Sequence, residues 1–411
     1  MKGVLVILDG IGDGPCPTLG GKTPLEAAKT PHLDALARRG KMDYCWTVKK
    51  GFVPESHQGI MSLLGYDLVD EDRGTLEALG LGVKLNPGDL ALRCNFATVE
   101  DLASRRVLDR RAGRTLTTNE ARELSKAINK EVKLGYPFEF VPGVQHRGVL
   151  VIRGGFSANI TEVDVDPKGR FTWVQAQDDE EDTALAAELV NRFLRESHKV
   201  LEDHPVNMDR VRKGLFSANF VLCRGAGNQV PRLKKVKGKW MGLSYMPLET
   251  GIEKVSGMDL YTFRYPKMKN LDVYRNLYDG LSKALTQSVR MMRWYWKKQD
   301  YFLVYLKETD VPGHDNKPLD KVAMLERIDK GLFSYLEKWA RKFGIRIVVT
   351  ADHSTPCSQK GHSADPVPVL TSPWGGAWAD VEEKARRFTE QEGLKGRGLL
   401  GKQVLPERLF S

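Results

Sequence analysis

Two short apolar runs in this chain, YFLVYL and IRIVVT, each lead into a polar segment. The polar residues that follow them include Asp310, His314, Asp352, His353 and His362. Any one of these residues alone is more often a helix cap or a packed side chain. Carboxylates and imidazoles together, however, are the ligands that borderline divalent metals prefer in proteins. The grouping therefore predicts a zinc or manganese site.

The two runs, 301–306 and 345–350, have the length and composition of buried strands in a parallel sheet. Apolar residues between them recur at helical spacing over 321–342. A strand–helix–strand unit forms a right-handed crossover, so both polar segments should emerge at the same edge of one sheet. Ligand sites of open α/β sheets lie at that edge. We therefore expect the polar residues to converge.

Asp9 and Ser56 extend this pattern toward the N-terminus. Asp9 follows GVLVIL (3–8), the first expected strand, and Ser56 precedes a helical stretch at 60–64. By themselves they suit a turn and a helix cap. Beside metal ligands, the Ser56 hydroxyl is a candidate nucleophile, because a metal promotes its deprotonation and a helix N-terminus stabilises a phosphoryl group.

Arginines in the middle of the chain are candidates for gripping an anion. Arg110, Arg111 and Arg114 surround a turn of small residues, and Arg224 follows an expected strand at 219–223. Such arginines bind carboxylate or phosphate through paired hydrogen bonds. A solvated charge run is the alternative for the 105–114 segment.

The composition indicates a two-domain globular protein. The chain has 411 residues, 41% hydrophobic and 28% charged, which is long for one domain. No apolar run approaches the ~18 residues of a membrane span. The five cysteines are dispersed without a CxxC motif, which favours reduced thiols and a cytoplasmic location.

The formal charge of +10 favours an anionic partner. The basic runs of the chain are not interleaved with aromatic residues, which proteins use to stack on the bases of single-stranded nucleic acid. We therefore expect a small anionic substrate rather than nucleic acid or a membrane. Both a monomer and a homo-oligomer remain open.

Several longer motifs make the chain resemble the cofactor-independent phosphoglycerate mutases of the alkaline phosphatase superfamily, in particular their archaeal-type branch. The resemblance extends almost from end to end. The motifs that carry it include VILDGIGDGP, GGKTPLEAAKTPHLDALA, RGTLEALGLG, DLALRCNFAT, DRRAGR, LCRGAG, TDVPGHDNKP and TADHSTPCSQKGHSADPVPVL.

This resemblance implies an α/β fold with a mostly parallel, alkaline-phosphatase-like sheet and helices on both faces. It implies a metal-binding domain made of 1–85 and 256–411, and an inserted smaller α/β (α+β) substrate domain at 86–255. It also implies two divalent metals; manganese is expected, with zinc, magnesium or cobalt as alternatives. The implied activity is the glycolytic interconversion of 3- and 2-phosphoglycerate through a phosphoserine.

Carried over residue by residue, the resemblance assigns Asp310, His314 and His362 to one metal and Asp9, Ser56, Asp352 and His353 to the other. Ser56 becomes the nucleophile, assisted by Arg110 and Arg224. The implied substrate-binding residues are Asp109, Arg110, Arg111, Arg114, His146, Arg147 and Arg224. Hinges are expected at 80–88 and 250–262.

The chain departs from the family pattern in two places. The nucleophile segment reads Glu55 to Ile60 (ESHQGI) instead of Gly-Ser-Asp-Thr-Ala-His, and Thr250 stands where the family has a lysine aimed at the phosphoryl site. His57 and Lys267 are candidates to compensate. These departures keep two alternatives open: a related metal-dependent phosphoryl or phosphonyl transferase, for example homoserine-kinase-like, and a non-enzymatic binding protein.

Overall fold

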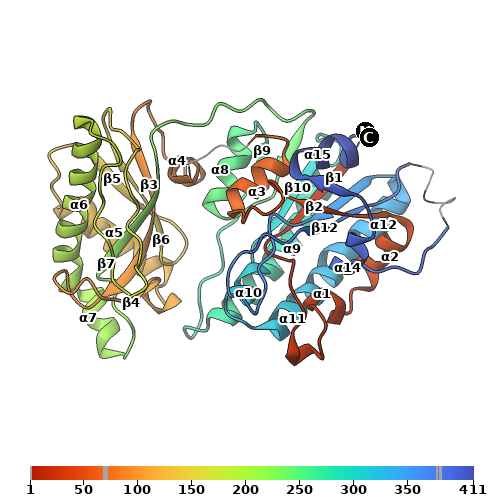
Figure 1. Ribbon diagram of the computed structural model, residues 1–411, viewed down its shortest axis with the longest axis horizontal. Coiled ribbons are helices and arrows are strands. Elements are labelled where there is room, and N and C mark those ends of the chain that lie inside the picture. Colours follow the sequence, from red (N-terminus) through yellow and green to blue (C-terminus); the bar gives the residue numbers. More distant parts are fainter. Residues whose placement is uncertain (1, 68–72, 376–377, 379–381) are drawn as a thin grey trace.

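The computed structural model describes residues 2–67, 73–375, 378 and 382–411. Within these residues the chain forms an eight-stranded and a five-stranded β-sheet, each with its own large hydrophobic core. Figure 1 shows the five-stranded unit on the left, the eight-stranded unit on the right and helix α4 (Arg73–Gly80) between them.

The eight-stranded sheet has the order β13-β2-β12-β11-β1-β10-β8-β9. Strand β12 runs antiparallel to both of its neighbours, and the other described pairs are parallel. The strands are β1 (Gly3–Leu8), β2 (Lys41–Trp46), β8 (Trp240–Gly242), β9 (Asp259–Leu260), β10 (Tyr301–Leu306), β11 (Arg346–Thr350), β12 (Val367–Thr371) and β13 (Gly398–Leu400). The mostly parallel sheet expected from the sequence is confirmed.

Helices cover both faces of this sheet (Figure 1). On one face lie α1 (Pro24–Ala27), α2 (Pro31–Arg39), α9 (Val273–Tyr295), α11 (Pro318–Ile328) and α12 (Ser334–Phe343); on the other lie α3 (Ser56–Leu63), α8 (Pro247–Val255) and α15 (Gly401–Val404). The predicted helix 321–342 is formed by α11, a π-helical turn (Asp329–Phe333) and α12. No helix in the described ranges is long and apolar enough to cross a membrane.

Shorter elements complete this unit. They are a 3₁₀ turn (Pro17–Leu19), α10 (Asp310–His314), α14 (Glu390–Leu394) and a π-helical turn (Leu405–Leu409).

The five-stranded sheet is antiparallel, and β3 pairs with β4, β6 and β7 while β5 pairs with β6. Helices α5 and α6 cover one face, and α4 contacts β3, β6 and β7. The bounds are β3 (Leu90–Val99), β4 (Val107–Asp109), a 3₁₀ turn (Ala112–Arg114), α5 (Thr118–Glu131), β5 (Phe138–Pro142), β6 (Arg147–Ile152), α6 (Glu181–Glu202), α7 (Pro205–Arg212) and β7 (Phe220–Gly227).

Side-chain alternation along β3 gives this sheet two different faces. Leu90, Leu92, Cys94 and Phe96 enter the core under α5 and α6. The residues between them, including Arg93 and Asn95, are therefore directed to the opposite face. This second face is the one that turns toward the eight-stranded unit (Figure 1).

The end of the insertion differs from the expected boundary at 255/256. Strand β8 pairs with β10, and residues of 240–255 such as Trp240, Leu248 and Ile252 lie in the core of the eight-stranded unit. The chain therefore returns to the large unit before 240. The short β8 gave no clear strand signal in the sequence because it contributes only Trp240–Gly242 to the sheet.

Candidate active site

The site lies at the carboxyl edge of three adjacent parallel strands. Leu8 of β1 pairs with Leu306 of β10, and Ile7 of β1 pairs with Thr350 of β11. Because the three strands end in register, Asp9, the 307–314 segment and the 351–353 segment emerge side by side. The convergence expected from the crossover is observed.

Asp9, Asp352 and His353 form the deeper of two groups, and all three are fully buried. His353 Nε2 lies 3.2 Å from Asp9 Oδ1 and 3.5 Å from Asp352 Oδ2. It also lies 3.2 Å from Ser56 Oγ. Ser56 is the first residue of α3, and the N-terminus of a helix carries a partial positive charge.

Asp310, His314 and His362 form the second group. His314 Nε2 lies 3.4 Å from Asp310 Oδ2, and His362 Nε2 lies 3.9 Å from Asp310 Oδ1. The ring of His362 stacks on that of His353, with centroids 3.7 Å apart. The two groups are therefore contiguous.

Each of the three histidines is held through its other ring nitrogen. The Nδ1 contacts are His353 with Thr355 Oγ1 at 3.1 Å, His314 with the Lys360 carbonyl at 3.1 Å and His362 with the Pro54 carbonyl at 2.9 Å. These contacts leave Nε2 facing the carboxylates. The same second interaction orients histidines that ligate metals.

The chemistry of these residues fits two divalent cations. In each group, candidate ligand atoms lie within 4.8 Å of one another. Asp9 Oδ1 is buried and, apart from the 3.2 Å contact with His353 Nε2, has no hydrogen-bond partner among the described residues. Burial raises the pKa of Asp352 to about 7, and the Asp9 carboxylate adds to this effect. Buried carboxylates at such close range require positive charge to remain ionised.

Asp13, Cys16 and Cys357 form a third group of possible ligand atoms. Cys357 Sγ lies 3.1 Å from Asp13 Oδ2. Lys321, which is fully buried, donates to the same carboxylate oxygen at 2.8 Å. Since this ammonium already neutralises Asp13, the group does not need a metal.

A cavity of about 330 Å³ adjoins Ser56 and the second group. Its walls come from both units and are rich in arginine. The lining residues are Glu55, Ser56, Arg73, Arg93, Asn95, Arg110, Arg111, Arg114, His146, Arg147, Leu222, Arg224, Lys307, Asp310, Val311, His314 and His362. The structure thus brings six of the seven predicted substrate-binding residues to one cavity.

Asp109 is the exception, since it does not line this cavity. Its Oδ1 accepts hydrogen bonds from the backbone N–H groups of Arg111 and Gly113, both at 2.7 Å. It therefore shapes the turn that presents the arginines. Arg110 Nη2 lies 2.7 Å from Asp164 Oδ1, an oxygen that Arg224 also contacts.

One arginine of this turn bridges the two units. Arg114 Nη1 lies 2.6 Å from Asp315 Oδ2, and Asp315 directly follows α10. Tyr274 donates its hydroxyl to the same oxygen at 3.0 Å. An ion pair therefore links the two units beside the cavity.

The residue before the nucleophile belongs to an ion-pair network. Glu55 Oε2 lies 2.9 Å from Arg73 Nη1, and the pKa of Glu55 is lowered to about 2: burial would raise it, but Arg73 outweighs this. Arg73 Nε and Arg93 Nε approach Glu77 Oε1 at 3.1 and 3.6 Å. Glu55 thus fixes Arg73 at the mouth of the site.

His57 and Lys267, the two candidates to replace the missing family lysine, do not line this cavity. Thr250 is buried in α8 and donates to the Met246 carbonyl at 2.9 Å. Lys267 lines a different cavity. Burial lowers the pKa of His57 to about 4, so its ring is neutral at pH 7. Neither His57 nor Lys267 supplies a cation to this cavity.

Lys307 does line the cavity, and its ammonium contacts Asp9 Oδ2. Burial opposes the charge, but the Asp9 and Asp310 carboxylates outweigh it and raise the pKa of Lys307 above its usual value. Sequence reasoning overlooked Lys307, Arg73, Arg93 and Asn95. Lys307 had a usable signal, since it is the first residue after the 301–306 strand.

The fold and the site define an α/β protein with two candidate metal-binding groups that face a cationic cavity. A profile of the family "2,3-bisphosphoglycerate-independent phosphoglycerate mutase" matches residues 37–207. A protein of that name from Pyrococcus abyssi is 39% identical over 406 residues, which cover 96% of this chain and 93% of the relative. One from Methanopyrus kandleri is 39% identical over 408 residues, with the same coverage.

Two solved structures resemble the chain over nearly its whole length. A Pyrococcus horikoshii protein has a TM-score of 0.74 at 30% identity and covers 100% of this chain and 96% of its own. The cofactor-independent phosphoglycerate mutase of Thermoplasma acidophilum has a TM-score of 0.57 at 29% identity, covering 99% and 98%. The chain belongs to the 2,3-bisphosphoglycerate-independent phosphoglycerate mutase family of enzymes.

Proposed function

We propose that this protein interconverts 3- and 2-phosphoglycerate through a phosphoserine on Ser56. The observation that carries the proposal is the position of the Ser56 hydroxyl. It lies at the start of α3, 3.2 Å from His353 Nε2, and opens into the cavity lined by arginines. Membership of the mutase family supports the same reaction.

The proposal includes two divalent cations, with manganese expected. Asp310, His314 and His362 would hold one; Asp9, Ser56, Asp352 and His353 would hold the other. When bound, such ions stabilise charge on phosphoryl oxygens and lower the pKa of a serine hydroxyl.

The other residues of the cavity bind and orient the substrate. Arginines 110, 111, 114, 147 and 224 can grip the carboxylate and phosphate through paired hydrogen bonds. Lys307 is proposed to face the phosphoryl group beside Ser56 in place of the family lysine. The two units together shield the phosphoserine from water, which would otherwise hydrolyse it.

The two half-reactions balance. Ser56 Oγ forms a bond to phosphorus while the bond to the C3 oxygen breaks, and the serine proton passes to that oxygen. The glycerate then turns within the cavity. Its C2 hydroxyl takes the phosphoryl group from Ser56 and returns one proton to the serine oxygen.

The Ser56→Ala variant tests this route. Removing the nucleophile should lower turnover of 3-phosphoglycerate by several orders of magnitude, because the covalent path disappears. Mass spectrometry of wild-type protein quenched in acid during turnover should find phosphate on the peptide that contains Ser56. Near-normal turnover by Ser56→Ala would exclude the mechanism.

A second candidate is transfer of a phosphoryl or phosphonyl group to another small hydroxy acid. It is favoured by the Thr250 departure and by a second cavity of about 490 Å³, which shares Glu55, Arg73, Arg93 and Arg224 with the first. A phosphorus NMR screen with Mn²⁺ separates the two candidates. Turnover of another acid in preference to 3-phosphoglycerate would support the second.

We also propose that residues 86–239 move as one unit and that the cytoplasm is the protein's location. The first hinge stays at 80–88, whereas the second shifts from 250–262 to 228–239, since β8 is anchored in the large sheet. The contact of Arg114 with Asp315 is available to close the cleft. The five free cysteines favour a reducing compartment; a membrane or extracellular signal from a tagged chain in cells would contradict that location.

A further inference from the structure

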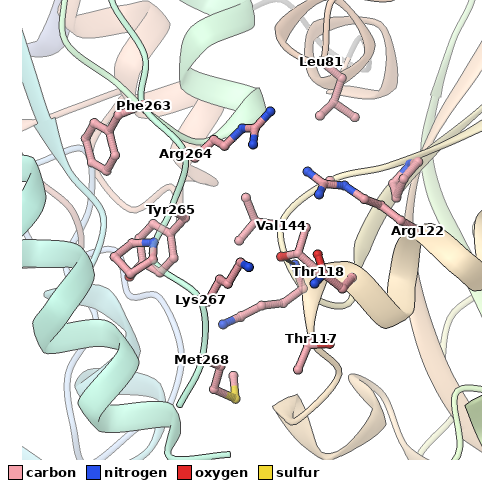
Figure 2. Close-up of a pocket in the computed structure, with 15 residues that line it drawn as sticks. Leu81, Thr117, Thr118, Arg122, Val144, Phe263, Arg264, Tyr265, Lys267 and Met268 are labelled. Atoms are coloured by element: carbon pink, nitrogen blue, oxygen red, sulfur yellow. Dashed lines mark hydrogen bonds between the residues drawn. The ribbon is translucent and has the colours of Figure 1, made fainter.

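Another cavity between the two units, of about 370 Å³, lies beside the catalytic cavity and shares no lining residue with it. One wall comes from the start of α5 and the turn between β5 and β6, and the facing wall is the 263–268 segment (Figure 2). Its size falls within the range of small-molecule sites, roughly 300–1,000 Å³.

The charge of this cavity is entirely positive. Arg122 projects from the α5 side, and Arg264 and Lys267 lie on the opposite wall (Figure 2). Among the residues that the structure describes, no aspartate or glutamate lines the cavity. Within the described ranges, none of the three cationic groups makes an ion pair or a side-chain hydrogen bond. Three unpaired cations around one cavity favour an anion.

The remaining walls combine polar residues, among them Thr118 and Asn119, with apolar ones. Leu81, Val144, Phe263 and Met268 border the space between the three cationic side chains (Figure 2). Cations combined with apolar walls suit a ligand that has both an anionic group and an apolar or aromatic part. An inorganic anion alone would leave the apolar walls unused.

A hydrogen bond joins the two units beside this cavity. Gln145 Nε2 donates to Asn276 Oδ1 at 2.8 Å, and Asn276 Nδ2 donates to the Pro266 carbonyl at 3.0 Å. Arg122 faces Arg264 and Lys267 across the gap (Figure 2), and like charges oppose the approach of the walls. An anion between them reverses this repulsion.

The walls also connect to the catalytic site. Gln145 directly precedes His146 and Arg147, which line the catalytic cavity. Tyr265 donates its hydroxyl to Glu308 Oε1 at 3.0 Å, next to Lys307. A ligand held here therefore contacts segments that continue into the catalytic cavity, without entering that cavity.

We propose that this cavity is a second binding site, for an organic phosphate with an apolar or aromatic portion. Arg122, Arg264 and Lys267 hold the phosphate, and the apolar walls hold the remainder. The bound ligand links the two units. The site goes beyond the proposed mutase reaction, since none of its lining residues belongs to the catalytic cavity.

Isothermal titration calorimetry on the full chain with Mn²⁺ tests this site. Saturating 3-phosphoglycerate is present throughout, so that the catalytic cavity is occupied. The probes are AMP, ribose 5-phosphate and inorganic phosphate, which share the phosphate but differ in the rest. The test variant carries Arg122→Gln, Arg264→Gln and Lys267→Gln. The matched control carries Arg232→Gln, Lys234→Gln and Lys237→Gln, three exposed cations of the 228–239 segment.

We expect AMP to bind with one site per chain and at least tenfold more tightly than the other two probes. The test variant should lose at least tenfold in AMP affinity, and the single Lys267→Gln variant several-fold, whereas the control should match the wild type. Equal AMP binding by test variant and control, equal affinity for all three probes, or no AMP binding at millimolar concentration would each overturn the proposal. Because the readout is binding, it is independent of whether Ser56 carries out the mutase reaction.

Discussion

Replacing Lys307 with methionine tests the proposal that its ammonium takes the place of the family lysine. Lys307 lines the catalytic cavity, and its ammonium contacts Asp9. Methionine has a similar length and keeps the apolar part of the side chain in place. The substitution therefore changes the charge of the cavity with little change in its shape.

The size of the effect follows from the position of the charge. A unit charge about 4 Å from a reacting oxygen contributes about 4 kcal/mol at an effective dielectric constant of about 20. The phosphate is already anionic in the ground state, so only part of this energy favours the transition state. We expect kcat to fall about 100-fold, which corresponds to about 2.7 kcal/mol.

The assay is turnover of 3-phosphoglycerate with Mn²⁺, together with the metal content of the protein. Metal binding should not weaken, because the ammonium shares the Asp9 carboxylate with any cation there. Lys254→Met, a change of an exposed residue of α8, is the control for loss of one positive charge and should stay within twofold of the wild type. A Lys307→Met enzyme with kcat within about threefold of the wild type would refute the role of Lys307.

Three other variants probe the metal groups, the buried acids and the contact between the units. His362→Ala should lower the metal content from about two equivalents to about one and leave the fold intact; two retained equivalents would contradict the ligand assignment. Burial raises the pKa of Glu253 to about 8, so its protonated form is favoured in the fold. Stability should then fall as pH rises from about 4.5 to 8, with a total effect of up to about 5 kcal/mol. Glu253→Gln should remove this slope in urea unfolding while keeping the bond from Ser244, and an unchanged slope would exclude Glu253 as its source. Asp315→Asn breaks the ion pair with Arg114 and should raise KM roughly three- to tenfold with little change in kcat; unchanged KM and unchanged solution scattering with substrate would argue against closure through this pair.

The two metal-binding groups could be predicted from the sequence because most of their residues follow shortly after a buried strand. A buried parallel strand delivers the residue after it to the carboxyl edge, whatever the rest of the fold does. Asp9, Asp310 and Asp352 each follow such a strand, and His314 lies one helical turn after Asp310. A helix at 321–342 connects two of these strands, so their crossover is right-handed and both strands end at the same edge of the sheet.

The arginine cluster could not be predicted in full, because it depends on the register between distant strands. Arg93 pairs with Arg224 and Asn95 with Arg147, so these side chains share one face of the sheet. A shift of one residue would turn them into the core under α5 and α6. Arg93 lies in an apolar strand, where its alternation alone did not reveal which face meets the other unit.

The search for a cation in place of the family lysine shows the same difference between what the sequence predicts and what the fold adds. The residue type at position 250 is enough to predict the loss of a cation, because threonine is uncharged. Finding another cation near the site requires distances between side chains: Lys267 lies in a separate cavity, whereas Lys307 reaches Asp9 from the next strand. Charge interactions depend on distance through space, and pairing between β1 and β10 brings together two residues that lie far apart in the chain.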